Sequence, residues 1–459
     1  MRDNGGNRRL EGSVNKGTLF EMPEGQQRAA APPTRPEEAR VVRPERRQLQ
    51  WVARDLEGAV SQDHPARAIW AMLDELDLSA FYGFIKAVVD RPGRPTTDPQ
   101  VLLGLWLLAT VEGVGSARRL ARLCQEHDAY RWLCGGVPIN YHMLSDFRVA
   151  HQAALDGLLT QIVASLMAAG AVSLEKVAQD GMRVRASAGA SSFRRRKRLE
   201  EYLEEARAQV ERLAQEREHP DSGVSQREQA ARERAARERI ERVKQALGYL
   251  PEAQGVKERQ QKSKAIKDRV KVTEPRVSTT DPEARVMKRA DGGFRPAYNV
   301  QLATDQANGV IVGVAVTAQG TDAGQAVPME AQVVSRTGHQ PQAYLMDGGF
   351  VSNEAITALG KARVPVYAPV RLPKHKPEGE RYRPHYGDTP EVTQWRQRMA
   401  TDEAKAVCRQ RGAIAEWTNA QVRQHGVSRF TVRGLAKVTT VMLLVAVAHN
   451  LLRWTAFIG

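Results

Sequence analysis

Two segments of the chain carry apolar residues at the spacing of paired helices, and they interrupt a region whose other segments alternate like strands. Between residues 193 and 213 the apolar positions are separated by four, three, four and three residues, and a similar run follows between 236 and 247. This spacing aligns apolar side chains along one seam, which a second helix covers. The Pro and Gly of 219–223 end the first helix. We therefore predict an antiparallel helical hairpin at 193–253, inserted into a strand-containing domain and carrying a solvated charged surface.

The rest of the chain divides by its periodicity. Residues 1–50 are rich in Gly, Pro, Arg and Glu without a period, which predicts a disordered or loose arm. Residues 51–169 follow a helical pattern throughout. Residues 170–192 and 254–459 mix strand and helix patterns, which predicts a mixed sheet with helices packed on it. The expected fold class is therefore mixed α+β or α/β: a helical N-terminal domain, then a sheet domain that the hairpin interrupts.

Short helices joined by a glycine turn make up the predicted helical domain. Asp98 and Pro99 form a helix start before the apolar run 101–110, and Ser116 is placed to cap a helix at 117–126. This succession resembles helix-turn-helix packing, although a plain helical bundle has the same pattern. We expect this domain to bind DNA, with phosphate contacts from Arg118, Arg119 and Arg122.

The charge of the chain favours a polyanionic partner. The formal net charge is +15 and the pI about 9.9. Lys and Arg side chains that neutralise phosphates release condensed counterions, so such an excess predicts binding to double-stranded DNA. A strip at 257–271 is dense in basic residues and is a further predicted phosphate contact, through Lys262, Lys264 and Lys267.

Cysteine usage and hydropathy predict a cytoplasmic protein with no membrane partner. The three cysteines are odd in number and form no Cys-x-x-Cys pair, so neither a disulfide framework nor a structural zinc site is expected. The N-terminus lacks the apolar core of a signal peptide. The longest apolar run, 438–448, is too short to span a bilayer and predicts a buried helix. In a bacterium the protein would associate with the nucleoid when bound to DNA.

Three acidic residues stand where a metal site would need them. Asp180 follows a predicted strand at 172–179, Asp347 follows one at 342–346, and Glu416 lies on a late helix. Acids just past strand ends face the crevice where ligands bind in open sheets. Three carboxylates suit Mg²⁺ or Mn²⁺, and two such ions support phosphoryl transfer. Each acid alone is more often a turn residue, and Asp305 is the second choice of ligand.

Four groups of segments carry a further signal. They are 93–136 with HMLSDFR (142–148), VAQDGMRVRASAG (177–189), GGFRPAYNVQLATD (292–305) with YLMDGGF (344–350), and CRQRGAIAEWTNAQVR (408–423) running into RFTVRGLAKV (429–438) and AHNLLRW (448–454). In this order they resemble the DDE transposases of bacterial insertion sequences, in the branch with an all-helical N-terminal domain. The resemblance covers about residues 60–456. It implies an RNase H-like sheet and metal-dependent cleavage and transfer of DNA strands at element ends. It also implies that Asp180, Asp347 and Glu416 are the catalytic metal ligands.

The segment around the third acid departs from that family's pattern at two positions. The family has a Tyr, an Arg, the Glu and then a Lys; Arg411 and Glu416 match, whereas Cys408 replaces the Tyr and Arg423 the Lys. Glu416 and Arg423 are seven residues apart and share a helix face, so Arg411 and Arg423 are predicted to contact DNA near the metals. Cys408 has neither the ring nor the hydroxyl of Tyr, and the departures leave the level of activity open.

Three functions compete on these observations. The first is a transposase, the second a catalytically inactive transposase-derived DNA-binding protein, and the third a metal-dependent nuclease that cuts without joining. The acids and the C-terminal segment favour the transposase. Because two DNA ends must be held together, a homodimer is expected. Trp417, beside Glu416, is expected to pack against the fold rather than stack on a base.

Overall fold

The computed structural model describes residues 55–85, 87, 95–218, 225–262, 266–289, 292–372 and 377–458. All of them belong to one compact unit, Arg54–Gly459. The arm predicted at 1–50 lies outside the described residues, and so does Lys264 of the predicted basic strip.

Seven α-helices form the described part of the N-terminal region, and two of them start at the capping residues seen in the sequence. The side chain of Asp98 accepts a hydrogen bond from the N–H of Gln100, and Ser116 accepts one from Arg119. Two of the helices meet at His151, between Ala150 and Gln152, and the ring of His151 packs against Phe147. The seven are α1 (Pro65–Glu75), α2 (Ser79–Tyr82), α3 (Pro99–Val111), α4 (Ala117–Glu126), α5 (Asp128–Cys134), α6 (Tyr141–Ala150) and α7 (Gln152–Ala168).

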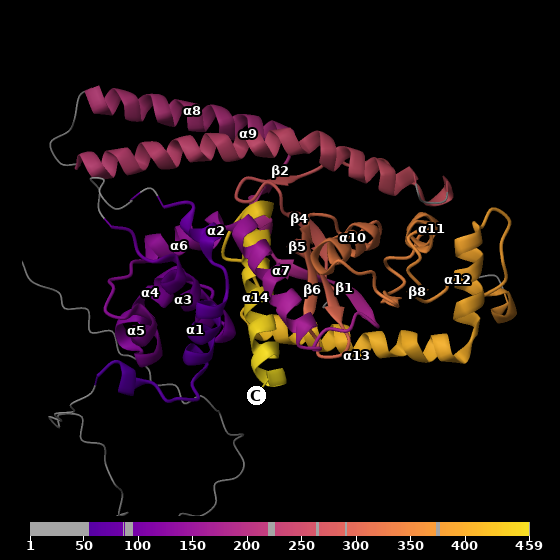
Figure 1. The fold of residues 1–459 in the computed structure, drawn as a ribbon. Coiled ribbons are helices and arrows are strands. Elements are labelled where there is room, and N and C mark those ends of the chain that lie inside the picture. Colours follow the sequence, from indigo (N-terminus) through magenta and orange to yellow (C-terminus); the bar gives the residue numbers. More distant parts are fainter. Residues whose placement is uncertain are drawn as a thin grey trace, which may run out of the picture. The chain divides into compact units, whose positions relative to one another are not determined.

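A mixed sheet with the predicted helices forms the second half (Figure 1). Its order is β4-β5-β1-β7-β8, and β6 pairs with β5 beside β4. Strand β5 runs antiparallel to its neighbours β1, β4 and β6, whereas β1, β7 and β8 run parallel to one another. This arrangement confirms the predicted mixed fold class. The strands are β1 (Val177–Arg185), β4 (Arg285–Lys288), β5 (Phe294–Asp305), β6 (Ile311–Thr317), β7 (Tyr344–Leu345) and β8 (Val366–Tyr367).

The first strand is displaced from its predicted position. It was expected at 172–179 with Asp180 just beyond its end, but β1 begins at Val177 and Asp180 lies inside it, opposite Leu302 of β5. Leu174 has a left-handed backbone with φ of 56°, which excludes it from a strand. The apolar residues at 172–176 therefore form a buried turn, and Asp180 points to one face of the sheet.

Five helices cover the sheet. Thr401 separates two of them, which end at Ala400 and begin at Asp402, and its side chain caps the second by accepting a hydrogen bond from the N–H of Ala404. The last helix is longer than the apolar run at 438–448 and is, by length and composition, able to cross a membrane. Most of it is buried against α7, α3 and β6, as in a core helix. The five are α10 (Ala326–Thr337), α11 (Asn353–Lys361), α12 (Pro390–Ala400), α13 (Asp402–Gln424) and α14 (Leu435–Ile458).

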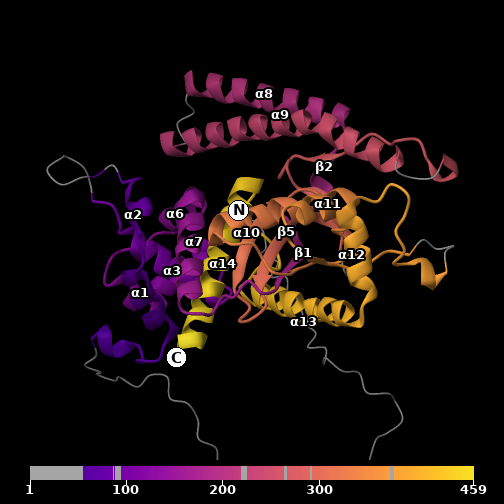
Figure 2. The same ribbon diagram turned by 45° about the vertical axis from the view of Figure 1, so that its right-hand side comes forward.

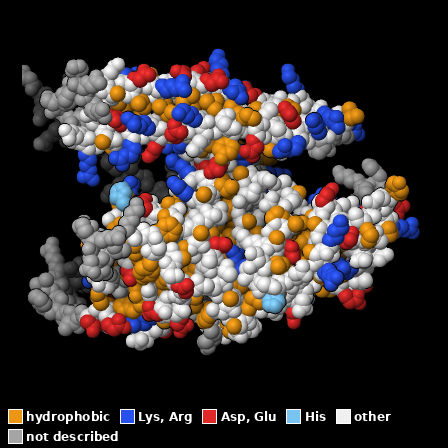
Figure 3. All heavy atoms as spheres, turned by 45° about the horizontal axis from the view of Figure 1, so that its top comes forward, with side chains coloured by type: hydrophobic (Ala, Val, Ile, Leu, Met, Phe, Trp, Pro, Cys, Tyr) orange, Lys and Arg blue, Asp and Glu red, His pale blue; other side chains and the backbone are white. Residues whose placement is uncertain are grey.

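The helical hairpin is present and is longer than predicted. Helix α8 (Arg196–Glu218) pairs with α9 (Gln226–Lys262), which continues past residue 253 with Pro251 inside it. Figures 1 and 2 both show the two helices side by side along the outside of the sheet and its helices. Figure 3 shows basic and acidic side chains interspersed along the hairpin, as its alternating sequence predicts. The hairpin has its own cluster of buried residues, separate from the main core: Leu199, Val243, Ala246, Leu250 and Val277.

Candidate active site

The centre of the site is Asp180, which connects the sheet to α13. Its Oδ2 accepts a hydrogen bond of 2.8 Å from the side-chain amide of Asn419, and its Oδ1 lies 3.7 Å from the guanidinium of Arg411. Arg411 and Asn419 are eight residues apart, so the same face of α13 presents both. The carboxylate of Asp180 is therefore held from one side by a helix that starts more than 200 residues later in the sequence.

Asp347 lies beside it because of the strand order. It follows β7, the strand that runs parallel to β1, so the two acids come from neighbouring strands. The N–H of Gly349 donates a 2.6 Å hydrogen bond to Asp347 Oδ1, and a Cβ at position 349 would lie 2.8 Å from that oxygen. Only glycine fits this turn without displacing the carboxylate.

A third acid, Asp322, was missed by the sequence analysis. Its Oδ2 pairs with Arg183 at 2.7 Å, and its Oδ1 accepts hydrogen bonds of 2.8 Å from Asn299 and from Gln301. These partners come from β1 and β5. Asp322 precedes α10 in an irregular segment, so neither a strand end nor a helix pattern marked it in the sequence.

The acids repel one another at Asp180. Burial raises the pKa of the Asp180 carboxyl, and the charges of Asp347 and Asp322 raise it further. The N–H of Gly181 and the charge of Arg411 act in the opposite direction. A desolvated carboxylate close to like charges favours a proton or a cation. The donor set, all carboxylate oxygen, is the kind that Mg²⁺ and Mn²⁺ prefer.

Glu416 shares a helix with the partners of Asp180. It is on α13, three residues before Asn419, and its side chain is exposed, whereas Ala415, Thr418 and Asn419 are buried. Three residues correspond to about 4.5 Å along a helix. Among the residues that the structure describes, no group of three His, Cys, Asp or Glu side chains is close enough to hold a metal ion. Asp180 and Asp347 thus interact electrostatically, while Glu416 stands one helical turn from the residue that binds Asp180.

The second-choice ligand, Asp305, has another partner set. Its carboxylate is fully buried and accepts hydrogen bonds from the N–H groups of Leu174 and Ala307. It therefore fastens the turn after β5 to the segment before β1. This is the turn role that an Asp at a strand end has most often.

The aromatic and sulfur side chains on α13 pack against the fold. Trp417 is 38% exposed, and its ring would lie 2.5 Å from a Cβ at Gly309. Its ring also meets His449 edge-on, and the guanidinium of Arg453 lies over it at 5.0 Å. Cys408 is half-buried against the main core. The expectation that Trp417 packs against the protein agrees with these contacts.

The residues predicted to contact DNA are mostly on the surface. Arg118, Arg119 and Arg122 are exposed on α4, on the side opposite the buried Leu120, and Arg118 lies over the ring of Tyr141 at 5.1 Å. On α13, Arg423 is exposed and Arg411 is half-buried beside Asp180. Lys262 and Lys267 are exposed near the end of α9. The exposed arginines of α4, Arg423, Lys262 and Lys267 are thus accessible to a large polyanion, whereas Arg411 faces Asp180.

Two family models match separate parts of the chain. Residues 54–150 match a family described as "Transposase domain (DUF772)", and residues 376–455 match one described as "Transposase DDE domain". The first covers the helices α1 to α6, and the second covers α12, α13 and most of α14, including Glu416 and Asn419. Neither the curated proteins nor the solved structures contain a match to the chain.

Proposed function

Because this chain is a transposase of insertion-sequence type, with a DUF772 domain and a DDE domain, we propose that it cleaves the ends of an insertion sequence and joins them to target DNA with Asp180, Asp347 and Glu416 as its catalytic acids. The observation that carries the proposal is the hydrogen bond from Asn419 to Asp180. This bond attaches α13, the helix that carries Glu416, to β1, the strand that carries Asp180. The strand order brings β7, which precedes Asp347, next to β1.

Transposases with a DDE domain typically use a divalent metal, and the residues here fit one. Asp180 and Asp347 would hold the ion, and Glu416 would complete the site by turning its exposed side chain inward. A divalent cation bound there stabilises the negative charge that develops on the transferred phosphate. We propose two ions, because a pair would supply both activation of the attacking oxygen and stabilisation of the leaving one.

The basic residues have separate tasks in this proposal. Arg411 balances the charge of Asp180, and Arg423 holds a DNA phosphate beside the acids. Arg118, Arg119 and Arg122 hold the duplex at the helical region, while Lys262 and Lys267 hold it near the end of α9. A homodimer is proposed because two element ends must be held at once.

The test compares Asp347→Asn with the wild type in two assays. DNA binding is measured as a function of salt, and Mg²⁺-dependent cleavage is measured on the DNA ends that flank the gene. The substitution keeps the size of the side chain and removes its charge, so binding should be unchanged or slightly tighter. Cleavage should fall by several orders of magnitude, because the metals supply most of the transition-state charge stabilisation.

The same assays separate the competing functions. Equal cleavage by both proteins would refute the assignment of Asp347. Binding without cleavage by the wild type would favour the inactive DNA-binding protein, and cleavage without a joined product would favour the nuclease.

A further inference from the structure

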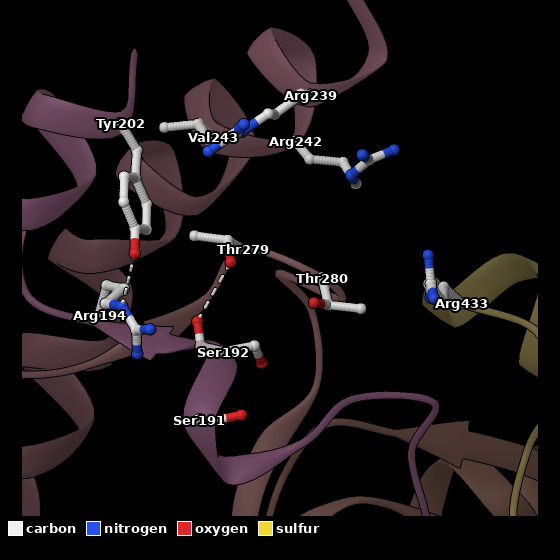
Figure 4. Close-up of a pocket in the computed structure, with 10 residues that line it drawn as sticks. All are labelled: Ser191, Ser192, Arg194, Tyr202, Arg239, Arg242, Val243, Thr279, Thr280 and Arg433. Atoms are coloured by element: carbon white, nitrogen blue, oxygen red, sulfur yellow. Dashed lines mark hydrogen bonds between the residues drawn. The ribbon is translucent and has the colours of Figure 1, made fainter. Parts of the chain in front are cut away.

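A basic pocket lies at the base of the helical hairpin, away from the acids. Its volume is about 410 Å³, and it is open to solvent. Figure 4 shows the side chains around it, which come from the segment after β1, helices α8 and α9, the segment at 279–280 and the loop before α14. The residues that line it are Ser191, Ser192, Arg194, Tyr202, Arg239, Arg242, Val243, Thr279, Thr280 and Arg433.

The lining is rich in hydrogen-bond donors and in positive charge. Four arginines and five hydroxyl side chains surround the cavity, and all the described residues that line it are neutral or basic. Guanidinium groups and hydroxyls are the donors that proteins use for phosphate oxygens. The pocket therefore has the composition of a site for phosphate groups.

The arginines are only weakly neutralised by the protein. Arg239 lies 3.8 Å from Glu205 and Arg242 lies 3.5 Å from Glu238, and all four side chains are a third or more exposed. Such pairs contribute little and are easily exchanged. Arg433 donates to the backbone carbonyl of Ser187 through its Nε, which leaves the two terminal amino groups of the guanidinium for another partner.

Arg433 also interacts electrostatically with Asp281, but no ion pair joins the two among the described residues. Asp281 is fully buried, and its carboxylate accepts hydrogen bonds from the hydroxyl of Tyr298 and the N–H of Gly434.

The pocket also has a defined position along the first strand. Arg433 donates to the carbonyl of Ser187, which lies two residues beyond the end of β1 at Arg185, and β1 is the strand that carries Asp180. The pocket therefore lies past the end of that strand, and a DNA duplex bound at Asp180 can extend toward it.

We propose that this pocket binds the phosphodiester backbone of the DNA that the transposase cleaves, to one side of the cleaved bond. The inference rests on the proposed function for the identity of the DNA. It adds Arg242 and Arg433 to the contacts predicted from the sequence, and it gives the base of the hairpin a role in holding DNA.

The test is the salt dependence of binding to a random-sequence duplex of about 40 base pairs, measured by fluorescence anisotropy without metal. Each lost phosphate contact lowers the slope of log K against log salt by about 0.9. Arg242→Gln/Arg433→Gln should therefore lower it by about 1.8, and the loss of affinity between 50 and 200 mM salt should be roughly tenfold smaller than for the wild type.

Two matched variants control for charge and folding. Arg207→Gln/Arg237→Gln removes the same charge from exposed positions of the same hairpin and should keep the wild-type slope. Arg242→Lys/Arg433→Lys keeps the charge at the pocket and should restore most of the slope. Equal slopes for the two Gln pairs would overturn the proposal.

A small-anion site is a separate outcome. If the pocket variant loses binding of inorganic phosphate in calorimetry but keeps the wild-type DNA slope, the pocket serves a small anion and the proposal fails. If the wild type itself binds DNA without a steep slope, the proposed function loses its DNA partner, and this result is distinguishable from failure at the pocket alone.

Discussion

Asn419 and Asp180 are joined by a 2.8 Å hydrogen bond although 239 residues separate them in the sequence. The amide of Asn419 donates, so it stabilises the ionised form of the carboxylate and fixes which oxygen faces α13. The bond therefore both positions a predicted metal ligand and attaches the helix that carries Glu416 to the sheet.

Asn419→Ala should lower cleavage by about 10- to 100-fold and raise the Mg²⁺ concentration needed for half-maximal rate, as loss of an outer partner of a metal ligand does. The measurement is a Mg²⁺ titration of the cleavage rate. Gln424→Ala, at an exposed position of the same helix, is the control. An unchanged metal dependence in Asn419→Ala would show that the bond only stabilises the fold.

Divalent metal should stabilise the protein through the acidic pair. With free Mg²⁺ at ten times its Kd, the added stability is about 1.4 kcal/mol, which raises Tm by roughly 2 °C for a unit of about 400 residues. Asp347→Asn should abolish this rise. The pKa of Asp180 is raised in the folded protein, so its ionisation costs stability as pH rises through that pKa, and the metal-dependent gain should grow over the same interval. An equal rise in both proteins would place the metal elsewhere.

The protein should lose stability in mild acid because of His449. Burial lowers the pKa of His449 to about 4, and the ring is hydrogen-bonded to the carbonyl of Gly309. The unfolded chain takes up this proton near pH 6.5, whereas the folded protein resists until about pH 4, so stability present above pH 6.5 falls across that interval by roughly 3 kcal/mol.

Chemical denaturation of wild type and His449→Gln at several pH values checks this. The variant should show a shallower loss between pH 6.5 and pH 4, while His339→Gln, at an exposed position, should match the wild type. A His449→Gln profile parallel to the wild type would assign the acid loss to other groups.

The hairpin should be removable without unfolding the rest. Its apolar cluster is separate from the main core, so replacing residues 196–262 by a short Gly-Ser linker exposes mainly Val277. That exposure costs about 1.5–2 kcal/mol. Thermal unfolding by circular dichroism should keep one cooperative transition at a slightly lower Tm, and DNA binding should weaken because the basic pocket is lost. Loss of the cooperative transition would make the hairpin part of the folding core.

The periodic elements were predictable from sequence because their signals are local. The caps at Asp98 and Ser116, the heptad seam of the hairpin and the strand pair β5–β6 each depend on residues within a few positions of one another. The shift of β1 was not predictable, because it depends on the left-handed conformation of Leu174 and the distant carboxylate of Asp305.

The residues of the candidate site were likewise predictable from sequence only where their signal is local. Asp180 and Asp347 were found because they stand near strands and match a family pattern. Asn419 and Asp322 were missed, because their importance comes only from partners on distant segments. Whether Glu416 turns inward depends on the position of α13 over β1, which no local pattern encodes.

The packing of the last helix determines whether the helical region can move relative to the acids. Helix α14 packs against α3 and α7 on one side and β6 on the other, and residues from Val60 to Leu451 share one core. The helical region is therefore not a module on a tether. A duplex bound by the helical region would therefore meet the acids at a fixed distance along its axis and at a fixed rotation about that axis. Inserting one base pair between the gripped sequence and the cut site would turn the scissile bond about one-tenth of a revolution around the duplex, as expected for about ten base pairs per turn. Half a turn would present the opposite strand.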